Sequence, residues 1–312
     1  MLPEVTSVVA PETTVYHHDG STRVFLRLLS CVRYEEILVL SGSPLLGAFL
    51  SMGNITIAKA AATLLLAAGN GCLVAHVFLL NDLSGISADL QDPNRPKVFT
   101  AKGIDRAQIK HLCMALGVLG LLLLSPFGSQ TLTIALIIAG VSALYSAPGI
   151  HMKGTPLLNS MLHFTGGLMH FLLGYSIFRG VDGRGLEIAC FFALIFVAGH
   201  LTHEVRDCDA DLLNGITTNA VALGKKWIFV SGLVIFMIAD VLLAALAGFG
   251  AVPRALVVVA ALGPLHLYWS LQALDSGLTF ESIRRLQVRY RGLYAAIGFM
   301  MVAAALLASR AR

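Results

Sequence analysis

The sequence predicts an all-α membrane protein built as a bundle of about nine transmembrane helices. Three observations support this fold class: 56% of the 312 residues are hydrophobic, only 13% are charged, and apolar stretches of membrane-spanning length recur along the chain. The bilayer core offers no water to backbone groups, so spanning segments must be helices or closed barrels. Long stretches such as residues 60–80 and 227–249 are too long and too apolar for barrel strands.

Nine spans are expected in chain order, each because an apolar run long enough to cross the hydrocarbon core separates two more polar stretches. They cover residues 36–52, 57–80, 107–124, 129–146, 157–179, 186–203, 227–249, 252–272 and 291–309. The first 22 residues are polar and lack the basic start and apolar core of a cleaved signal. We therefore expect a polar N-terminal segment over residues 1–30 and a single transmembrane domain over residues 31–312.

The distribution of basic residues predicts how the bundle is oriented. With nine spans, one membrane face carries sixteen Lys and Arg residues and the other carries six, namely Lys59, Arg179, Arg184, Arg254, Arg310 and Arg312. Cytoplasmic loops are enriched in Lys and Arg, so the richer face, with the N-terminus and the two acidic clusters described next, is expected on the cytoplasmic side of a bacterial cell membrane. The modest net charge of +4 is explained by attraction to anionic membrane lipid, without nucleic acid.

Two acidic clusters stand at the ends of apolar spans. The first cluster comprises Asn81, Asp82, Asp89 and Asp92, and the second comprises Asp207, Asp209 and Asp211. Members spaced four or seven residues apart share a helix face. Neighbouring carboxylates repel one another unless a cation joins them, and hard oxygen ligands suit Mg²⁺. We expect Mg²⁺ to be bound by Asn81, Asp82, Asp89, Asp207 and Asp211. The alternative is that these acids solvate the helix ends.

Basic residues accompany both clusters in a repeated order. Each cluster is followed by two spans and then by a polar segment on the same side, first residues 145–153 and later residues 284–291. This order suggests two pseudo-repeated four-helix units around one cytoplasm-facing cavity. Oxygen ligands for Mg²⁺ among basic residues suggest a phosphorylated substrate. The positive charge that a diphosphate would need would come from Arg95, Lys97, Lys153 and Arg206.

These segments resemble the motifs of the intramembrane aromatic prenyltransferases typified by 4-hydroxybenzoate polyprenyltransferase, the UbiA superfamily. The family's N-D-x-x-D-x-x-x-D motif resembles residues 81–89, which Asn94-Arg95-Pro96 follow. Its D-x-x-x-D motif followed by G-x-x-T resembles residues 207–218, and its Y-S-x-P-x-x-x-x-K loop resembles residues 145–153. The order of motifs and helices agrees over about residues 30–310. In two departures, Gly85 replaces the middle Asp of the first motif and His151 stands where many members have Arg.

The resemblance implies Mg²⁺-dependent transfer of an isoprenyl group from an isoprenyl diphosphate to a lipophilic or aromatic acceptor. Mg²⁺ with Arg95 and Lys153 would stabilise the leaving pyrophosphate, so that the allylic C–O bond ionises. The remaining diphosphate-binding residues would be Asn81, Lys97 and Arg206, and Tyr145 would belong to the catalytic set. His203 and Glu204 lie one turn before the second acidic cluster, so either could orient the acceptor or take its proton.

Two alternatives remain open from the sequence. The departures at Gly85 and His151 allow a terpene cyclase of the same architecture, in which a double bond of the donor attacks without an acceptor. A proton-coupled transporter would use the intramembrane Asp240 together with histidines of the spans. The clustering of acids at one membrane face argues against transport, because transport sites usually lie near the midplane.

Overall fold

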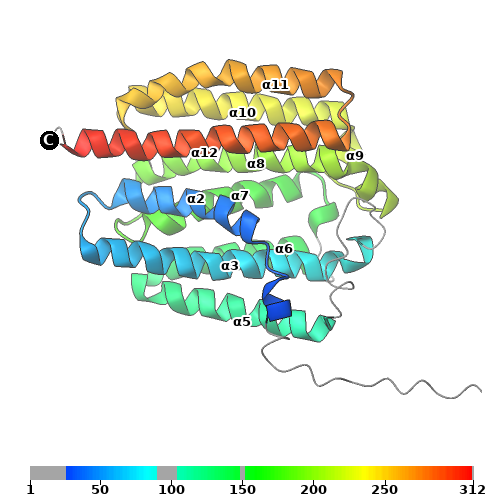
Figure 1. The fold of residues 1–312 in the computed structure, drawn as a ribbon, viewed down its shortest axis with the longest axis horizontal. Helices are drawn as coiled ribbons and strands as arrows, with labels where there is room; N and C mark the ends of the chain where they lie inside the picture. The colour runs from blue at the N-terminus through cyan, green and yellow to red at the C-terminus, as the bar shows by residue number, and fades with distance from the viewer. Residues whose placement is uncertain (1–25, 90–103, 148–151, 311–312) are drawn as a thin grey trace, which may run out of the picture.

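The computed structural model describes residues 26–89, 104–147 and 152–310, the side chains of residues 86–89 and 308–310 excepted. These residues form a bundle of helices (Figure 1). The first half contains α2 (Tyr34–Ser51), α3 (Ile57–Asp89), α5 (Arg106–Leu124), η1 (Ser125–Phe127) and α6 (Ser129–Ser146). The second contains η2 (Met152–Gly154), α7 (Leu158–Tyr175), α8 (Gly183–Leu213), α9 (Asn219–Leu223), α10 (Lys225–Gly248), η3 (Arg254–Leu262), α11 (Gly263–Asp275) and α12 (Phe280–Arg310).

The predicted fold class is confirmed, since each of the nine expected spans falls on a helix. Among the described residues, seven helical segments are long and apolar enough to cross a membrane. The other two expected spans, α2 and α7, have 18 residues each. Neither contains an 18-residue stretch as apolar as those of the other seven, because α2 has Glu35 and Glu36 in its first turn and α7 carries Asn159, His163 and His170. The chain is an integral membrane protein with several spans.

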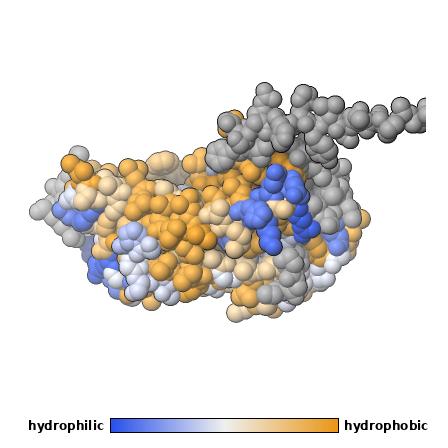
Figure 2. Space-filling model, turned by 90° about the horizontal axis from the view of Figure 1, so that it is seen from below, coloured by the Kyte–Doolittle hydropathy of each residue, from blue (hydrophilic) through white to orange (hydrophobic). Residues whose placement is uncertain are grey.

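The two shorter expected spans, α2 and α7, lie in the middle of the bundle. In Figure 1, α2 and α7 run between a group formed by α3, α5 and α6 and a group formed by α8, α10, α11 and α12. Hydrophobic side chains form a broad patch across the face seen in Figure 2, and hydrophilic ones gather toward its ends. On α5, exposed Met114, Val118 and Leu122 fit contact with lipid. Asn159 and His170 of α7 are thereby kept inside the protein, whereas Glu35 at the start of α2 is exposed.

Two helices extend further than hydropathy predicts. We expected α8 to end near residue 203 and residues 273–290 to form a basic loop, but α8 continues to Leu213 and α12 begins at Phe280. The predicted loop was wrong because Ile283, Leu286 and Tyr290, which are buried, recur at helical spacing among the charged residues. Consequently the second acidic cluster and the arginines of residues 284–291 are held on rigid helices.

A glycine contact fixes how closely α2 and α7 approach. A Cβ added at Gly174 would collide with the carbonyl oxygen of Pro44, and one added at Gly47 would collide with that of Phe171. Small residues allow such close helix packing within membranes. We expect Gly174→Ala to force the two helices apart and to destabilise the protein by about 3 kcal/mol.

Thermal unfolding in detergent measures this effect. Gly140→Ala is the matched control, because a Cβ at Gly140 on α6 would meet no atom within 4 Å. The control is expected to unfold at the wild-type temperature. A Gly174→Ala variant as stable as the control would mean that the contact does not limit the helix separation.

Candidate active site

A cavity of about 920 Å³ lies between the central helices and is lined by α2, α3, α6, α7, α8 and α12. At one end its wall is polar, with Arg33, Asn81, Tyr145, His203, Arg206 and Asp207. Elsewhere the wall is mainly apolar, with Leu46, Phe49, Ile138, Phe191, Phe192 and Met301. The cavity therefore offers a charged end and an apolar interior to one ligand.

The first acidic cluster reaches this polar end from α3. Asn81 lines the cavity, whereas Asp82 is buried, with only 5% of its surface exposed. Arg33, just before α2, donates from both Nε, at 3.1 Å, and Nη2 to the two carboxylate oxygens of Asp82. A buried carboxylate requires such a partner. The sequence analysis did not single out Arg33 as a site residue, although its position at the start of the first span could have indicated one.

The second acidic cluster reaches the same cavity from α8. Asp207 lines the wall, and Arg206 donates to its two oxygens from Nε at 2.7 Å and from Nη2 at 2.9 Å. Arg206 also donates from Nη1 to Oε1 of Gln287 on α12, at 2.8 Å. One turn further along α8, Asp211 is buried, and its Oδ1 lies 3.6 Å from the Nζ of Lys153. Asp209 instead points outward.

Oxygen ligands from two distant parts of the chain therefore face one space. The amide oxygen of Asn81 and the carboxylate of Asp207 belong to the hard donor class that Mg²⁺ prefers. Within the part of the chain that the structure describes, no three His, Cys, Asp or Glu residues converge as a metal-binding group. The residues fit Mg²⁺ in donor chemistry, and further oxygens would have to complete its coordination.

Several predicted site residues cannot be placed. Asp92, Arg95, Lys97 and His151 lie outside the described residues, as does the side chain of Asp89. Gly85 lies on α3, one turn beyond Asn81, where it provides no ligand. The roles predicted for these positions stay predictions.

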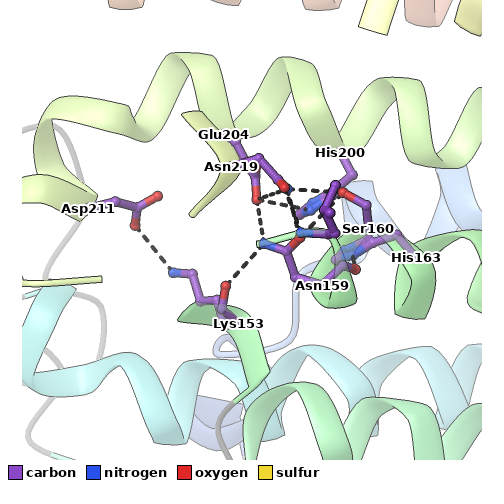
Figure 3. Close-up of polar contacts among 9 residues, drawn as sticks. Lys153, Asn159, Ser160, His163, His200, Glu204, Asp211 and Asn219 are labelled. Atoms are coloured by element: carbon purple, nitrogen blue, oxygen red, sulfur yellow. Dashed lines mark hydrogen bonds and ion pairs between the residues drawn. The ribbon is translucent and has the colours of Figure 1, made fainter. Parts of the chain in front are cut away.

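A buried hydrogen-bond network surrounds Glu204, which is 4% exposed (Figure 3). Asn159 donates from Nδ2 to Oε1 of Glu204 at 2.5 Å, and Asn219 donates to Oε2 at 3.0 Å. The same Asn159 amide donates to the carbonyl oxygen of Lys153 at 3.1 Å. The network thus connects α7, α8 and α9 and fixes the backbone of η2, which carries Lys153.

Two stacked histidines connect this network to the cavity. His200 Nε2 lies 3.2 Å from Oε1 of Glu204. The rings of His163 and His200 stack with centroids 3.5 Å apart and planes 8° apart, and Tyr145 meets His163 edge-on at 4.9 Å. All three rings line the cavity, whereas Glu204 is not part of its wall. Glu204 can therefore act on a ligand through His200.

His203, the other predicted proton acceptor, has a different environment. It lines the cavity, and Arg291 Nη2 lies 3.2 Å from its Nε2. Arg291 also reaches Glu36 on α2, with Nη2 3.4 Å from Oε1. Because a guanidinium can only donate, this contact occupies the Nε2 lone pair of His203. This environment suits a neutral His203 that orients a ligand better than one that accepts a proton.

Comparison with known proteins gives both a family and a fold. Residues 41–281 match the model of the UbiA prenyltransferase family, and a search of curated protein sequences found no match. Solved structure comparison gave a TM-score of 0.69 to digeranylgeranylglyceryl phosphate synthase, at 18% identity, covering 91% of this chain and 99% of that one.

Two further solved structures are also similar. A UbiA homologue from Archaeoglobus fulgidus bound to GPP and Mg²⁺ matches with a TM-score of 0.67 at 16% identity, covering 90% of this chain and 99% of that one. The apo structure of a UbiA homologue from Aeropyrum pernix K1 matches with a TM-score of 0.63 at 17% identity, covering 89% of this chain and 99% of that one. At these identities the likeness establishes the fold.

Proposed function

The chain belongs to the UbiA prenyltransferase family, and from this premise we propose that it transfers an isoprenyl group from an isoprenyl diphosphate to a lipophilic or aromatic acceptor with Mg²⁺ as cofactor. The observation that carries the proposal is the single cavity onto which Asn81 and Asp207 both face, polar at that end and apolar elsewhere. The choice of donor is supported by the Archaeoglobus fulgidus homologue, which binds GPP and Mg²⁺.

The polar end would receive the diphosphate. The Mg²⁺ ion would be held there by oxygens of Asn81, Asp82, Asp89, Asp207 and Asp211. When bound, Mg²⁺ would neutralise the charge that develops on the diphosphate as the allylic C–O bond breaks. Arg33 and Arg206, in the cavity wall, would donate to phosphate oxygens, together with Lys153, Arg95 and Lys97. The electron pair of the broken bond leaves with pyrophosphate.

The apolar part of the cavity would hold the isoprenyl tail. Phe191, Phe192 and Phe196 line it, and the rings of Phe171 and Phe192 stack behind this wall with centroids 4.8 Å apart. An allylic cation is quenched by water, so a dry aromatic wall protects it until the acceptor attacks. Aromatic faces also attract a cation.

The acceptor would lie against Tyr145, His163 and His200. We assign removal of its proton to His200, because this ring reaches the cavity while its Nε2 lies 3.2 Å from the buried Glu204. A carboxylate behind an imidazole orients the ring and stabilises the imidazolium once the proton has arrived. His203, beside Arg291, would orient the acceptor.

Purified protein in nanodiscs made with a lipid extract of its source cells, which supplies the acceptor, tests the proposal when geranyl diphosphate and Mg²⁺ are added. We expect pyrophosphate release that EDTA stops and added Mg²⁺ restores, and mass spectrometry of lipid extracts from cells with and without the protein names the prenylated product. Release that EDTA leaves unchanged would overturn the metal assignment. A cyclic hydrocarbon formed from the donor alone would identify a terpene cyclase instead.

Lys153 gives a second test of the diphosphate end. Its Nζ lies 3.6 Å from Asp211, and its backbone is held by Asn159. We expect Lys153→Ala to lower kcat/KM for the donor by about tenfold, because one charge-assisted contact to phosphate is lost. Lys225→Ala is the control, since Lys225 pairs with the outward-pointing Asp209 at 2.7 Å. Equal kinetics for both variants would remove Lys153 from the site.

A further inference from the structure

A second cavity, of about 520 Å³, lies between α11 and α12, apart from the candidate active site. Its polar wall includes Gln272 and Asp275 on α11 and Arg285 and Arg289 on α12, and Trp269 lies beside them. Both helices belong to segments that are long and apolar enough to cross a membrane. The cavity therefore combines basic side chains with a position between two spans.

The two arginines are available to an anion. Arg285 and Arg289 are one helical turn apart and exposed, and among the described residues neither forms an ion pair with an acid. Arg289 donates from Nη1 to Oε1 of Gln272 at 2.9 Å, and its guanidinium lies 5.8 Å from the centre of the Trp269 ring. These contacts hold Arg289 in place. Because Asp275 contributes one negative charge, the wall keeps an excess of one positive charge.

The depth of the cavity follows from contacts on the other side of α12. Gln287 accepts a hydrogen bond from Arg206, and Arg291 lies beside His203, so this part of α12 is level with the polar end of the candidate active site. Arg285 and Arg289 point outward from the same turns of the helix. In Figure 1 the connection from α11 to α12 lies at the same end of the bundle as α9. This is the level at which phospholipid headgroups would meet the protein.

The surface beside the arginines is suited to acyl chains. Val288 is 69% exposed, and Leu271 and Tyr268 are also exposed on these two helices. Trp and Tyr side chains favour the boundary between headgroups and hydrocarbon. Tyr268 and Trp269 stand there together, with the Tyr268 hydroxyl accepting a hydrogen bond from Nε2 of Gln272 at 2.9 Å.

We propose that the cavity between α11 and α12 binds the phosphate of an anionic phospholipid headgroup, with the acyl chains lying along the exposed apolar side chains of the two helices. Two guanidinium groups one turn apart can share the phosphate oxygens, and basic pockets between transmembrane helices are a known type of anionic-lipid site. A soluble phosphate would gain the arginine contacts but not the apolar ones. A lipid therefore fits better than a free anion.

Native mass spectrometry of the delipidated full-length protein tests the proposal directly. We expect phosphatidylglycerol to bind about tenfold more tightly than phosphatidylcholine with the same acyl chains, because the phosphatidylcholine headgroup has no net charge. Arg285→Gln/Arg289→Gln is expected to remove this preference, and Arg285→Lys/Arg289→Lys to restore most of it. Equal binding of the two lipids by the wild-type protein would overturn the proposal.

Arg284→Gln is the matched control, because Arg284 is on the same turn but pairs with Glu281 at 3.8 Å. This variant is expected to keep the wild-type preference for phosphatidylglycerol. If it loses that preference as fully as the double variant does, general surface charge and not the cavity explains the binding. Glycerol 3-phosphate is not expected to displace bound phosphatidylglycerol. Displacement at equal concentration would identify a soluble phosphate, and not a lipid, as the ligand.

Discussion

Asp207→Asn is expected to lower the rate of pyrophosphate release from geranyl diphosphate by about a thousandfold, because preorganised charge at a reacting phosphate is the largest contribution to such catalysis. Asp207 is the carboxylate of the second acidic cluster that lines the cavity, and both its oxygens contact Arg206. An amide keeps the shape but loses the charge that would bind Mg²⁺ and balance the guanidinium. Release of pyrophosphate by the purified variant measures the effect.

Asp209→Asn is the control for this prediction. Asp209 is two residues away on α8, but its side chain is 81% exposed and pairs with Lys225. The Asp209→Asn variant is expected to release pyrophosphate at a rate within about twofold of wild type, as for most exposed substitutions. Thermal unfolding of both variants separates a lost reaction from a lost fold. Near-normal release by a folded Asp207→Asn variant would exclude Asp207 as a ligand of the metal.

Glu204→Gln is expected to reduce formation of the prenylated product by about a hundredfold, the usual size of a general-base contribution. Breaking of the allylic C–O bond does not need this residue, so pyrophosphate release should fall much less, and the cation that the acceptor does not capture would be quenched by water to the prenyl alcohol. The informative quantity is therefore the ratio of product formed to pyrophosphate released. The prenylated product, identified beforehand in the lipid extracts, is quantified by mass spectrometry, and the released pyrophosphate is quantified in the same reaction.

A purely structural role would change both quantities together. Glu204 accepts hydrogen bonds from Asn159 and Asn219, so its replacement could also shift the backbone of Lys153. An equal loss of product and of pyrophosphate would therefore contradict the proton-transfer role. Glu187→Gln on the same helix, where Glu187 is exposed, is expected to change neither quantity.

The architecture was largely predictable because lipid imposes simple rules on sequence. Long apolar runs located the nine expected helices, and the order of polar motifs indicated the family. Helix ends were harder to predict, because α8 and α12 continue past their apolar runs as amphipathic helices. In those turns the periodicity of buried residues, and not mean hydropathy, defines the helix.

The contacts of the candidate site could not be predicted in the same way. Arg33 meets Asp82 across 49 residues of chain, Asn159 meets Glu204 across 45, and Arg206 meets Gln287 across 81. Such pairs depend on how helices pack, and one sequence gives no measure of that. Glu204 was singled out for its place one turn before Asp207, but its burial behind His200 required the structure.

The pairing of Asp82 with Arg33 and of Asp207 with Arg206 makes the binding of metal and donor interdependent under the proposed function. A cation arriving alone would compete with each guanidinium for its carboxylate and would leave two arginines without an anion. A cation arriving with the diphosphate brings a new anion for both arginines, so partner exchange conserves charge. We expect the metal and the donor to bind cooperatively, with weak uptake of either in the absence of the other.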